Sequence, residues 1–170
     1  LLDPSNQEVS FEILLRQGSS ELKAITNIYR ETLKRLGINV TISIIDSAQY
    51  KERTNVYDFD MTYYRRGLSL SPGNEQFLYW GSEGVTKFGS RNWMGINSTA
   101  VEKMIQRMLT SPDRADYISA VRALDRILMA GRYVIPIWYS PYSMIAHDSN
   151  LKYPVNIPAY GDWINFLPDV

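Results

Sequence analysis

Apolar positions alternate between strand spacing and helix spacing over the first part of the chain. The run "VSFEILLRQG" at 9–18 has the length of a strand, and apolar residues then recur at helical spacing over 21–36. The next run, "INVTISII" at 38–45, alternates as a strand again. A strand, a helix and a strand in this order predict a βαβ unit with two parallel strands.

Short polar residues indicate where the first helices begin. Ser19 or Ser20 is expected to cap the helix over 21–36, because their side chains accept hydrogen bonds from free amides of the first turn. Asp46 or Ser47 is expected to cap a shorter helix that ends near residue 56. The alternating segment "FDMTYYRRG" at 59–67 predicts a third strand.

Two further helices are predicted after residue 97. Ser98 or Thr99 begins the first, and Thr99 with Glu102 fits a capping box. One face of this helix is apolar and is formed by Val101, Met104, Ile105, Met108 and Leu109.

The last predicted helix begins in "SPDRADY" and runs to about Ala130, ending at Gly131. Ser111 is expected to be its cap, with Pro112 at the first helical position and Asp113 in the first turn. The segment "YVIPIWY" at 133–139 has strand composition, and Pro136 restricts it to a sheet edge or a strand end.

The order of these elements predicts an α/β fold with a mainly parallel sheet flanked by helices. The 170 residues fit one domain that buries a core of its own. We assign 1–152 to this domain and 153–170, rich in proline and aromatic residues, to an irregular tail.

Composition excludes several classes of function. Lys and Arg total 18, as do Asp and Glu, so no net field attracts nucleic acid. The chain has no cysteine, which excludes disulfides and thiolate metal sites, and no apolar run reaches membrane-spanning length. It begins at Leu1 without a Met or a signal peptide, and we expect an excised domain.

The sequence lacks a convergent catalytic set. His147 is the single histidine, no G-x-S-x-G elbow accompanies it, and a structural role is the better interpretation. Asp58 and Asp60 fall on one strand face, where a turn role is favoured over acid–base chemistry. No phosphate-binding glycine motif and no spaced metal ligands occur, so no cofactor or metal is expected.

The segment 65–98 is a loop region that keeps an unusual number of aromatic residues. It begins where the third strand ends, and in parallel α/β sheets ligands bind beyond the carboxyl ends of strands. Arg65 can bind a carboxylate or solvate the strand end, and Trp80 can face a ligand or the core of a short helix over 74–80. The pattern favours a binding surface for a neutral, extended ligand such as a peptide.

Three stretches together resemble a known family: "SPGNEQFLYWGS", "NWMGINSTAVEKMIQRML" and "SPDRADYISAVRALDRILMAGRYVIPIWYSP". They resemble the extracellular solute-binding proteins of the peptide/nickel class, the periplasmic receptors of ABC importers, and among these the Yej-type binders of oligopeptides and microcin C-like peptides. The resemblance implies one lobe, the C-terminal one, of a two-lobed (type II-like) binding protein. The implied partners are an oligopeptide, the N-terminal lobe and an inner-membrane permease, in the periplasm of a Gram-negative bacterium.

The resemblance also implies candidate cleft residues: Ser71, Asn74, Arg91, Asn92 and Trp93. Ser71 stands where many peptide binders of the family carry an aspartate that pairs with the peptide's amino group. A neutral hydroxyl does not form that charge-assisted bond, so Glu75 or Glu83 is the alternative anchor.

Two other classes of function stay open at this stage. One is an α/β hydrolase that uses His147 with a serine, and the other is a sensory domain derived from a binding protein. A binding protein without enzymatic activity is the prediction that the motifs favour.

Overall fold

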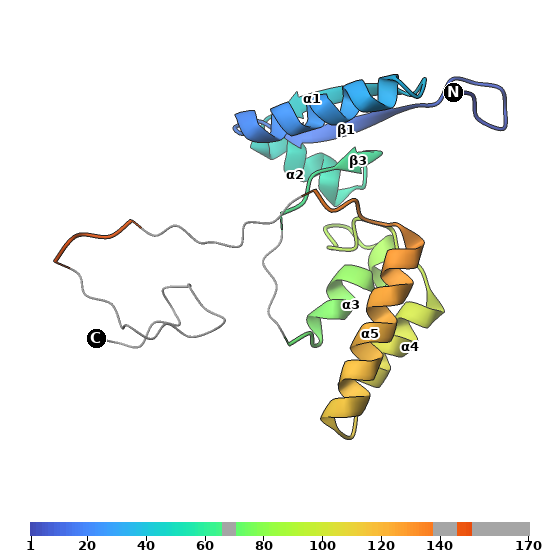
Figure 1. Cartoon of the computed structure of the whole chain (residues 1–170), viewed down its shortest axis with the longest axis vertical. Coiled ribbons are helices and arrows are strands. Elements are labelled where there is room, and N and C mark those ends of the chain that lie inside the picture. Colours follow the sequence, from blue (N-terminus) through green and yellow to red (C-terminus); the bar gives the residue numbers. More distant parts are fainter. Residues whose placement is uncertain (66–70, 138–145, 151–170) are drawn as a thin grey trace.

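The computed structural model describes residues 1–65, 71–137 and 146–150. It consists of two units, one above the other in Figure 1. The upper one, called the sheet unit, contains β1 (Ser10–Arg16), α1 (Ser20–Lys34), β2 (Asn39–Ile45), α2 (Ser47–Asn55) and β3 (Met61–Thr62). The lower one, called the helical unit, contains α3 (Glu75–Trp80), the 3₁₀ helix η1 (Ser82–Val85), α4 (Thr99–Leu109) and α5 (Arg114–Gly131).

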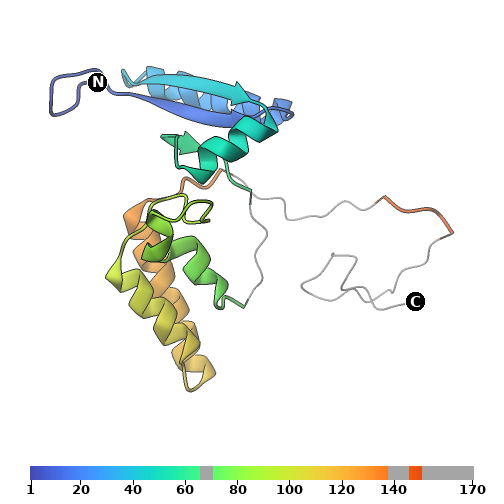
Figure 2. The same cartoon turned by 180° about the vertical axis from the view of Figure 1, so that it is seen from behind.

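The sheet unit is built on three parallel strands in the order β2-β1-β3. The central strand is β1, and its Ile13, Leu14 and Leu15 are buried. Helices α1 and α2 lie on opposite sides of the sheet (Figures 1 and 2). This arrangement follows because the two crossovers run in opposite directions from strand to strand. The predicted α/β class, with a parallel sheet flanked by helices, is confirmed.

Both predicted caps of the sheet-unit helices are confirmed. The Ser19 hydroxyl accepts a hydrogen bond from the Leu22 amide at the start of α1. At the start of α2, the Asp46 carboxylate accepts from the amides of Ala48 and Gln49. These contacts satisfy amides that have no partner within their helices.

The third strand is much shorter than the predicted 59–67. It pairs with β1 only at Met61 and Thr62, and the residues from 66 to 70 lie outside the described ones. Side chains replace backbone pairing here: the Asp60 carboxylate accepts from the Glu12 amide at 2.8 Å, and the Thr62 hydroxyl donates to the Leu14 carbonyl at 2.9 Å. Alternation in the sequence does not reveal such a substitution.

The helical unit has its own core around the pair α4 and α5. Most of the predicted face of α4 is buried or packs against this core, whereas Leu109 is 37 % exposed. The fully or nearly fully buried members of the core are Ile96, Val101, Ile105, Met108, Ala120 and Leu124.

The predicted start of α4 at Ser98 or Thr99 is confirmed, with Ser98 as the cap, but the predicted capping box is wrong because Glu102 accepts from Ser82. The predicted cap of α5 is also wrong. Asp113, not Ser111, caps α5 by accepting from the Asp116 amide. Helix α5 begins only at Arg114, so Asp113 holds the cap position, whereas Ser111 lies at the end of α4 and donates to the Arg107 carbonyl.

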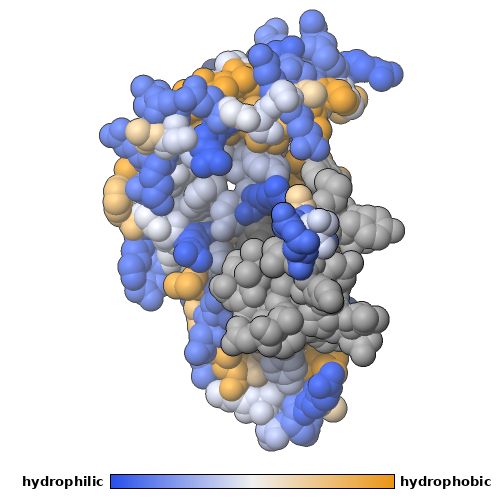
Figure 3. Space-filling model, turned by 90° about the vertical axis from the view of Figure 1, so that its left-hand side faces the viewer, coloured by the Kyte–Doolittle hydropathy of each residue, from blue (hydrophilic) through white to orange (hydrophobic). Residues whose placement is uncertain are grey.

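The segment after α5 differs from its prediction as a strand. Residues 133–137 have no regular secondary structure, and 138–139 lie outside the described residues. Tyr133, Val134, Ile135 and Ile137 are all exposed, and Pro136 lacks the amide that a strand pair requires. Figure 3 shows hydrophobic residues at several separate places among hydrophilic ones on one side of the molecule. No helix among the described residues is long and apolar enough to span a membrane.

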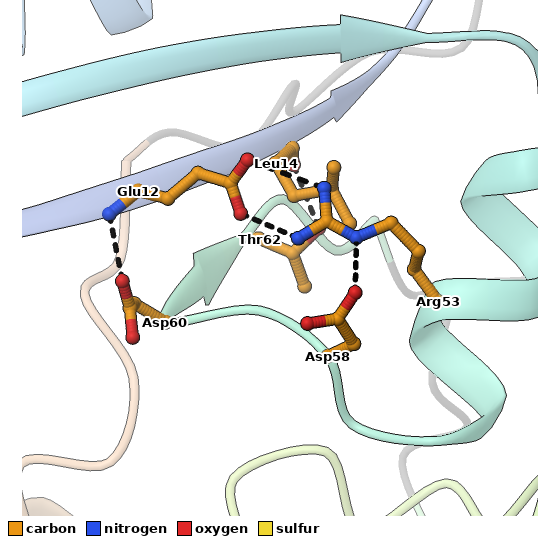
Figure 4. Close-up of polar contacts among 6 residues, drawn as sticks. All are labelled: Glu12, Leu14, Arg53, Asp58, Asp60 and Thr62. Atoms are coloured by element: carbon orange, nitrogen blue, oxygen red, sulfur yellow. Dashed lines mark hydrogen bonds and ion pairs between the residues drawn. The ribbon is translucent and has the colours of Figure 1, made fainter.

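A charged network joins α2 to the central strand of the sheet unit (Figure 4). Arg53 of α2 binds both carboxylate oxygens of Glu12 on β1, at 3.2 and 2.6 Å, and its Nε donates to Asp58 at 2.7 Å. The hydrogen bonds from Arg53 and then from Ser43 lower the pKa of Glu12. Asp58 and Asp60 are therefore structural groups, in line with the interpretation against acid–base chemistry.

Replacing Glu12 with Gln is expected to make stability less dependent on acid pH. The folded pKa of Glu12 lies below its ordinary value of 4.5, so its contribution is complete above that pH and is lost as the pH falls through the folded pKa. We expect Glu12→Gln to lower the free energy of unfolding by about 1 kcal/mol near neutral pH, because the pair is partly open to solvent. Urea unfolding of the wild type and the variant, near neutral pH and again below pH 4.5, measures this difference in stability.

Glu31→Gln is the matched control, since Glu31 pairs only with its neighbour Arg30 on the exposed face of α1. Its stability is expected to stay that of the wild type at both pH values. An equal loss in the two variants near neutral pH would contradict the structural importance of the Glu12–Arg53 pair.

Candidate functional site

The candidate site is built on the loop 81–97, which lies between α3 and α4 and contacts the sheet unit. The Gly89 amide donates to the Asn55 carbonyl at 3.1 Å, just after α2. The Tyr57 hydroxyl donates to the Gly84 carbonyl and lies 3.1 Å from that of Lys87. These bonds fix the loop beside the segment that leads into β3.

Trp93 forms a contact between the two units with three aromatic rings. Its ring meets those of Tyr50, Phe59 and Tyr64 edge to face, with centroids 6.4, 6.1 and 5.0 Å away. Its indole nitrogen donates to the Ser90 carbonyl at 3.1 Å. Such pairs contribute beyond the area they bury, so Trp93 stabilises the junction whether or not a ligand also meets it.

Tyr50 links this aromatic cluster to the sheet. Its hydroxyl lies 2.8 Å from the Thr62 hydroxyl and donates to the Tyr63 carbonyl at 3.0 Å. Burial raises the pKa of Tyr50. The phenol therefore stays neutral at physiological pH and acts as a fixed hydrogen-bonding group at the carboxyl end of β3.

Asn92 is fully buried, and its amide holds the loop together. The side-chain nitrogen donates to the Gly81 carbonyl at 2.9 Å and to the Ile96 carbonyl at 2.8 Å, while the oxygen accepts from the Ile96 amide at 2.9 Å. A Cβ on Gly84 would lie only 2.9 Å from the Cβ of Asn92, so glycine is required for this approach. Asn92 thus supports the site from below and offers no atom to a solute.

Arg91 precedes this buried residue and is exposed. Its Nη1 donates to the hydroxyl of Tyr79 at 3.1 Å, and its guanidinium carbon lies 5.8 Å from the centre of that ring. Tyr79 is buried on α3, so it holds Arg91 from a fixed position. The predicted site residue Arg91 is therefore both accessible and oriented.

Trp80 packs toward the core of the helical unit. It is partly buried against the cluster around α4 and α5, and its indole nitrogen donates to Gln76 at 2.9 Å. The ring of Trp80 also lies 6.5 Å from that of Tyr79. Of the two interpretations that the sequence left open for Trp80, facing a ligand or facing the core, these contacts favour the core.

The remaining predicted site residues lie at the start of α3 and after β3. Ser71 and Asn74 are exposed, and Asn74 occupies the cap position of α3 without a side-chain capping bond. Arg65 is exposed next to Tyr64, which touches Trp93. The Tyr117 hydroxyl of α5 donates to the Pro72 carbonyl at 2.7 Å, which ties this segment to the helical core.

Both acids considered as anchors for an amino group have a partner within their own segment, although that of Glu83 is open to solvent. Glu75 accepts from the Gly73 amide at 2.8 Å and from the Gln76 side chain. Glu83 lies 3.5 Å from Lys87. A third acid, Glu102, accepts from both the amide and the hydroxyl of Ser82, and these bonds lower its pKa.

The structure thus divides the seven predicted residues into groups. Arg91 and Trp80 meet at Tyr79, and Arg65 and Trp93 flank Tyr64. Ser71 and Asn74 lie exposed just before α3, and Asn92 lies buried within the loop. Sequence reasoning missed Tyr57 as a structural support of this loop. Its signal was weak, because a single Tyr with left-handed backbone (φ 59°) is not visible in an alternating pattern.

His147 lies outside this site. It is exposed within the described stretch 146–150, and its Nδ1 lies 2.8 Å from the Asp148 carbonyl. Among the described residues no group of three or more potential metal ligands occurs.

The relatives by sequence that are named here are about four times as long as this chain. The chain is 41 % identical over 160 residues to a protein of Brucella melitensis that is named as a binding protein, and the match covers 94 % of this chain and 26 % of that protein. It is 38 % identical to the "Probable peptide-binding protein YejA" of Agrobacterium fabrum, over 92 % of this chain and 25 % of that protein. The peptidoglycan-binding protein YepA of the same organism is 32 % identical, over 94 % of this chain and 26 % of that protein. No protein-family model matches.

Solved structures of binding proteins share the fold. The oligopeptide-binding protein AppA of Bacillus subtilis, in complex with a nonapeptide, matches with a TM-score of 0.68 and 22 % identity, over 77 % of this chain and 26 % of AppA. A periplasmic oligopeptide-binding protein of Thermotoga maritima with bound mannohexaose matches with a TM-score of 0.72 and 22 % identity, over 82 % of this chain and 26 % of the Thermotoga protein.

These matches confirm the resemblance that the sequence motifs indicated. The fold is that of part of a solute-binding protein of the oligopeptide/nickel class of ABC importers. In sequence, the chain is a homologue of the YejA-type binding proteins and spans about a quarter of their length.

Replacing Asn92 with Asp is expected to be strongly destabilising. The change keeps the side-chain size but removes both hydrogen bonds that Asn92 donates and buries a charge. Because two carbonyls lose their partner, we expect a loss of about 2–4 kcal/mol in the free energy of unfolding, measured with urea. The exposed Asn97 provides the control, and Asn97→Asp is expected to change stability by less than about 0.5 kcal/mol. Similar values for both variants would refute the role of the buried amide.

Replacing Trp93 with Ala is expected to weaken the junction between the units. Loss of a partly buried ring with three aromatic contacts should cost about 2 kcal/mol, less than for a fully buried tryptophan. Phe88→Ala is the control, since Phe88 lies in the same loop and is 71 % exposed. Denaturant unfolding of both variants measures the difference, and a Trp93 variant as stable as the wild type would argue against a structural ring.

Proposed function

We propose that this chain is the C-terminal lobe of the substrate-binding receptor of an ABC importer that captures oligopeptides. The observation that carries the proposal is the 38 % identity to a protein named for peptide binding, along 92 % of the chain. The loop geometry supports it, because exposed polar and aromatic groups stand on a buried frame at the carboxyl end of β3.

In this proposal the protein carries out no covalent chemistry. An oligopeptide binds between this lobe and an N-terminal lobe, and closure of the two lobes stabilises the shape that the permease recognises. The receptor then acts in the periplasm of a Gram-negative bacterium. The relatives and neighbours named above are binding proteins, which favours this function over the hydrolase that His147 suggested.

The candidate contact residues are those that the structure leaves accessible: Arg65, Ser71, Asn74 and Arg91. Trp80 and Trp93 contribute ring edges at most, since both pack into the protein. Asn92 contributes by holding the loop. In this proposal the peptide-facing surface contains fewer residues than the seven that the sequence predicted. Its side chains are mostly hydrogen-bond donors, and none of them is a carboxylate.

Peptide capture by the whole gene product tests this function. The protein is unfolded and refolded to remove bound solute, and is then incubated with a pool of random pentapeptides. Mass spectrometry of the retained peptides is expected to detect peptides, and a matched pool of small sugars is expected to be left behind. A protein that retains sugars and no peptide would show that the proposal names the wrong solute.

Introducing an acid at Ser71 is expected to add an anchor for the peptide amino group. A carboxylate at this exposed position can form a charge-assisted bond that a hydroxyl does not provide. We expect Ser71→Asp to favour free over N-acetylated peptides by about tenfold relative to the wild type. Ser71→Asn has the same size without the charge and is expected to show no such preference. If both variants behave alike, Ser71 does not face the amino terminus.

A further inference from the structure

The exposed arginine of the loop 81–97 is held in a geometry suited to binding an anion. Its guanidinium is fixed at one end by a hydrogen bond to the buried Tyr79, while its other donors have no acceptor in the part of the chain that the structure describes. A guanidinium presents five N–H groups in a planar fork, which matches the two oxygens of a carboxylate. Most of the N–H donors of Arg91 are therefore available to a ligand.

The backbone that carries Arg91 is rigid for reasons independent of Arg91 itself. The next residue, Asn92, is fully buried and makes three side-chain hydrogen bonds. The preceding Ser90 accepts the indole hydrogen bond of Trp93 and its hydroxyl accepts from the Asn92 amide. An arginine on such a support loses less conformational freedom on binding than one on an open surface.

The charges around Arg91 favour an anion over a cation. The five ion pairs formed by described residues involve other arginines and a lysine, so no carboxylate neutralises Arg91 there. Of the two acids considered as anchors for an amino group, Glu75 accepts from the Gly73 amide, and Glu83 forms a solvent-exposed pair with Lys87. Arg91 is thus an oriented cation with no carboxylate partner among the described residues.

From this geometry we propose that Arg91, positioned by the hydroxyl of Tyr79, is a subsite for a carboxylate of the solute. The proposal rests on the proposed function, in which the solute is a peptide. The carboxylate comes from the peptide's own chain end or from an aspartate or glutamate side chain. This lobe then selects peptides by a carboxylate. An aspartate at the Ser71 position would instead select them by the amino group.

Competition between two forms of one peptide pool tests the proposal on the whole gene product. Random pentapeptides are supplied as free acids and as C-terminal amides in equal amounts, and the retained peptides are identified by mass spectrometry. The wild type is expected to enrich peptides that carry a carboxylate by about tenfold. Enrichment of the free acids assigns the chain end, and enrichment of amides that contain Asp or Glu assigns the side chain.

Three variants isolate the arginine and its support. Arg91→Gln is expected to abolish the enrichment, and Arg91→Lys to restore part of it, because charge returns without the planar fork. Tyr79→Phe keeps the buried ring but loses the acceptor, and is expected to reduce the enrichment severalfold. Arg35→Gln, which changes an exposed arginine at the end of α1, is the control and should match the wild type.

The outcomes separate this proposal from the proposed function. A wild type that retains peptides without preferring carboxylates overturns the subsite and leaves peptide capture intact. Unchanged enrichment in Arg91→Gln overturns the assignment to Arg91. A wild type that retains neither form overturns peptide capture, and the subsite falls with it.

Discussion

The buried amide of Asn92 is the interaction on which the rest of the candidate site depends. It binds the end of α3 through Gly81 and the approach to α4 through Ile96, so one side chain closes a loop of sixteen positions between them. Because the side chain lies in the core, its hydrogen bonds have no competition from water and are costly to lose. The exposed Arg91 and the ring of Trp93 are the immediate neighbours of this fixed point.

This arrangement divides the work of the loop between three consecutive residues. Arg91 points to solvent beside Tyr79, Asn92 points inward, and Trp93 reaches across to the sheet unit. Tyr57 and the Asn55 carbonyl add polar contacts between the same two units. A loop that is otherwise poor in regular structure thereby joins the units and presents a cation. Binding groups on a rigid support need less ordering when a ligand arrives.

The sequence predicted the elements of the sheet unit well, because their signals are local. Strand alternation in β1 and β2, and the caps Ser19 and Asp46, depend on residues a few positions apart. The errors occur where a distant partner decides. Asp60 binds the β1 backbone with its side chain where a longer β3 would use its own backbone, and Ser111 lies at the end of α4, two residues before the cap of α5. Likewise, the composition of 133–137 suits a strand, but a strand also needs a partner to pair with, and these residues have no regular secondary structure.

The candidate site shows the same limit more sharply. Motifs select a segment for the site, but the residue types alone do not separate an accessible side chain from a buried support: Asn92 and Arg91 are adjacent and polar, yet one is fully buried and the other exposed. Burial follows from packing against α3 and α4, which no spacing within the loop encodes. The same packing gives Arg91 its partner, since Tyr79 lies twelve residues earlier and reaches the guanidinium only because the loop turns back along α3. Hence the charge preference that we propose for this surface is a property of the tertiary structure: the fold determines which cation is oriented by Tyr79 and left accessible.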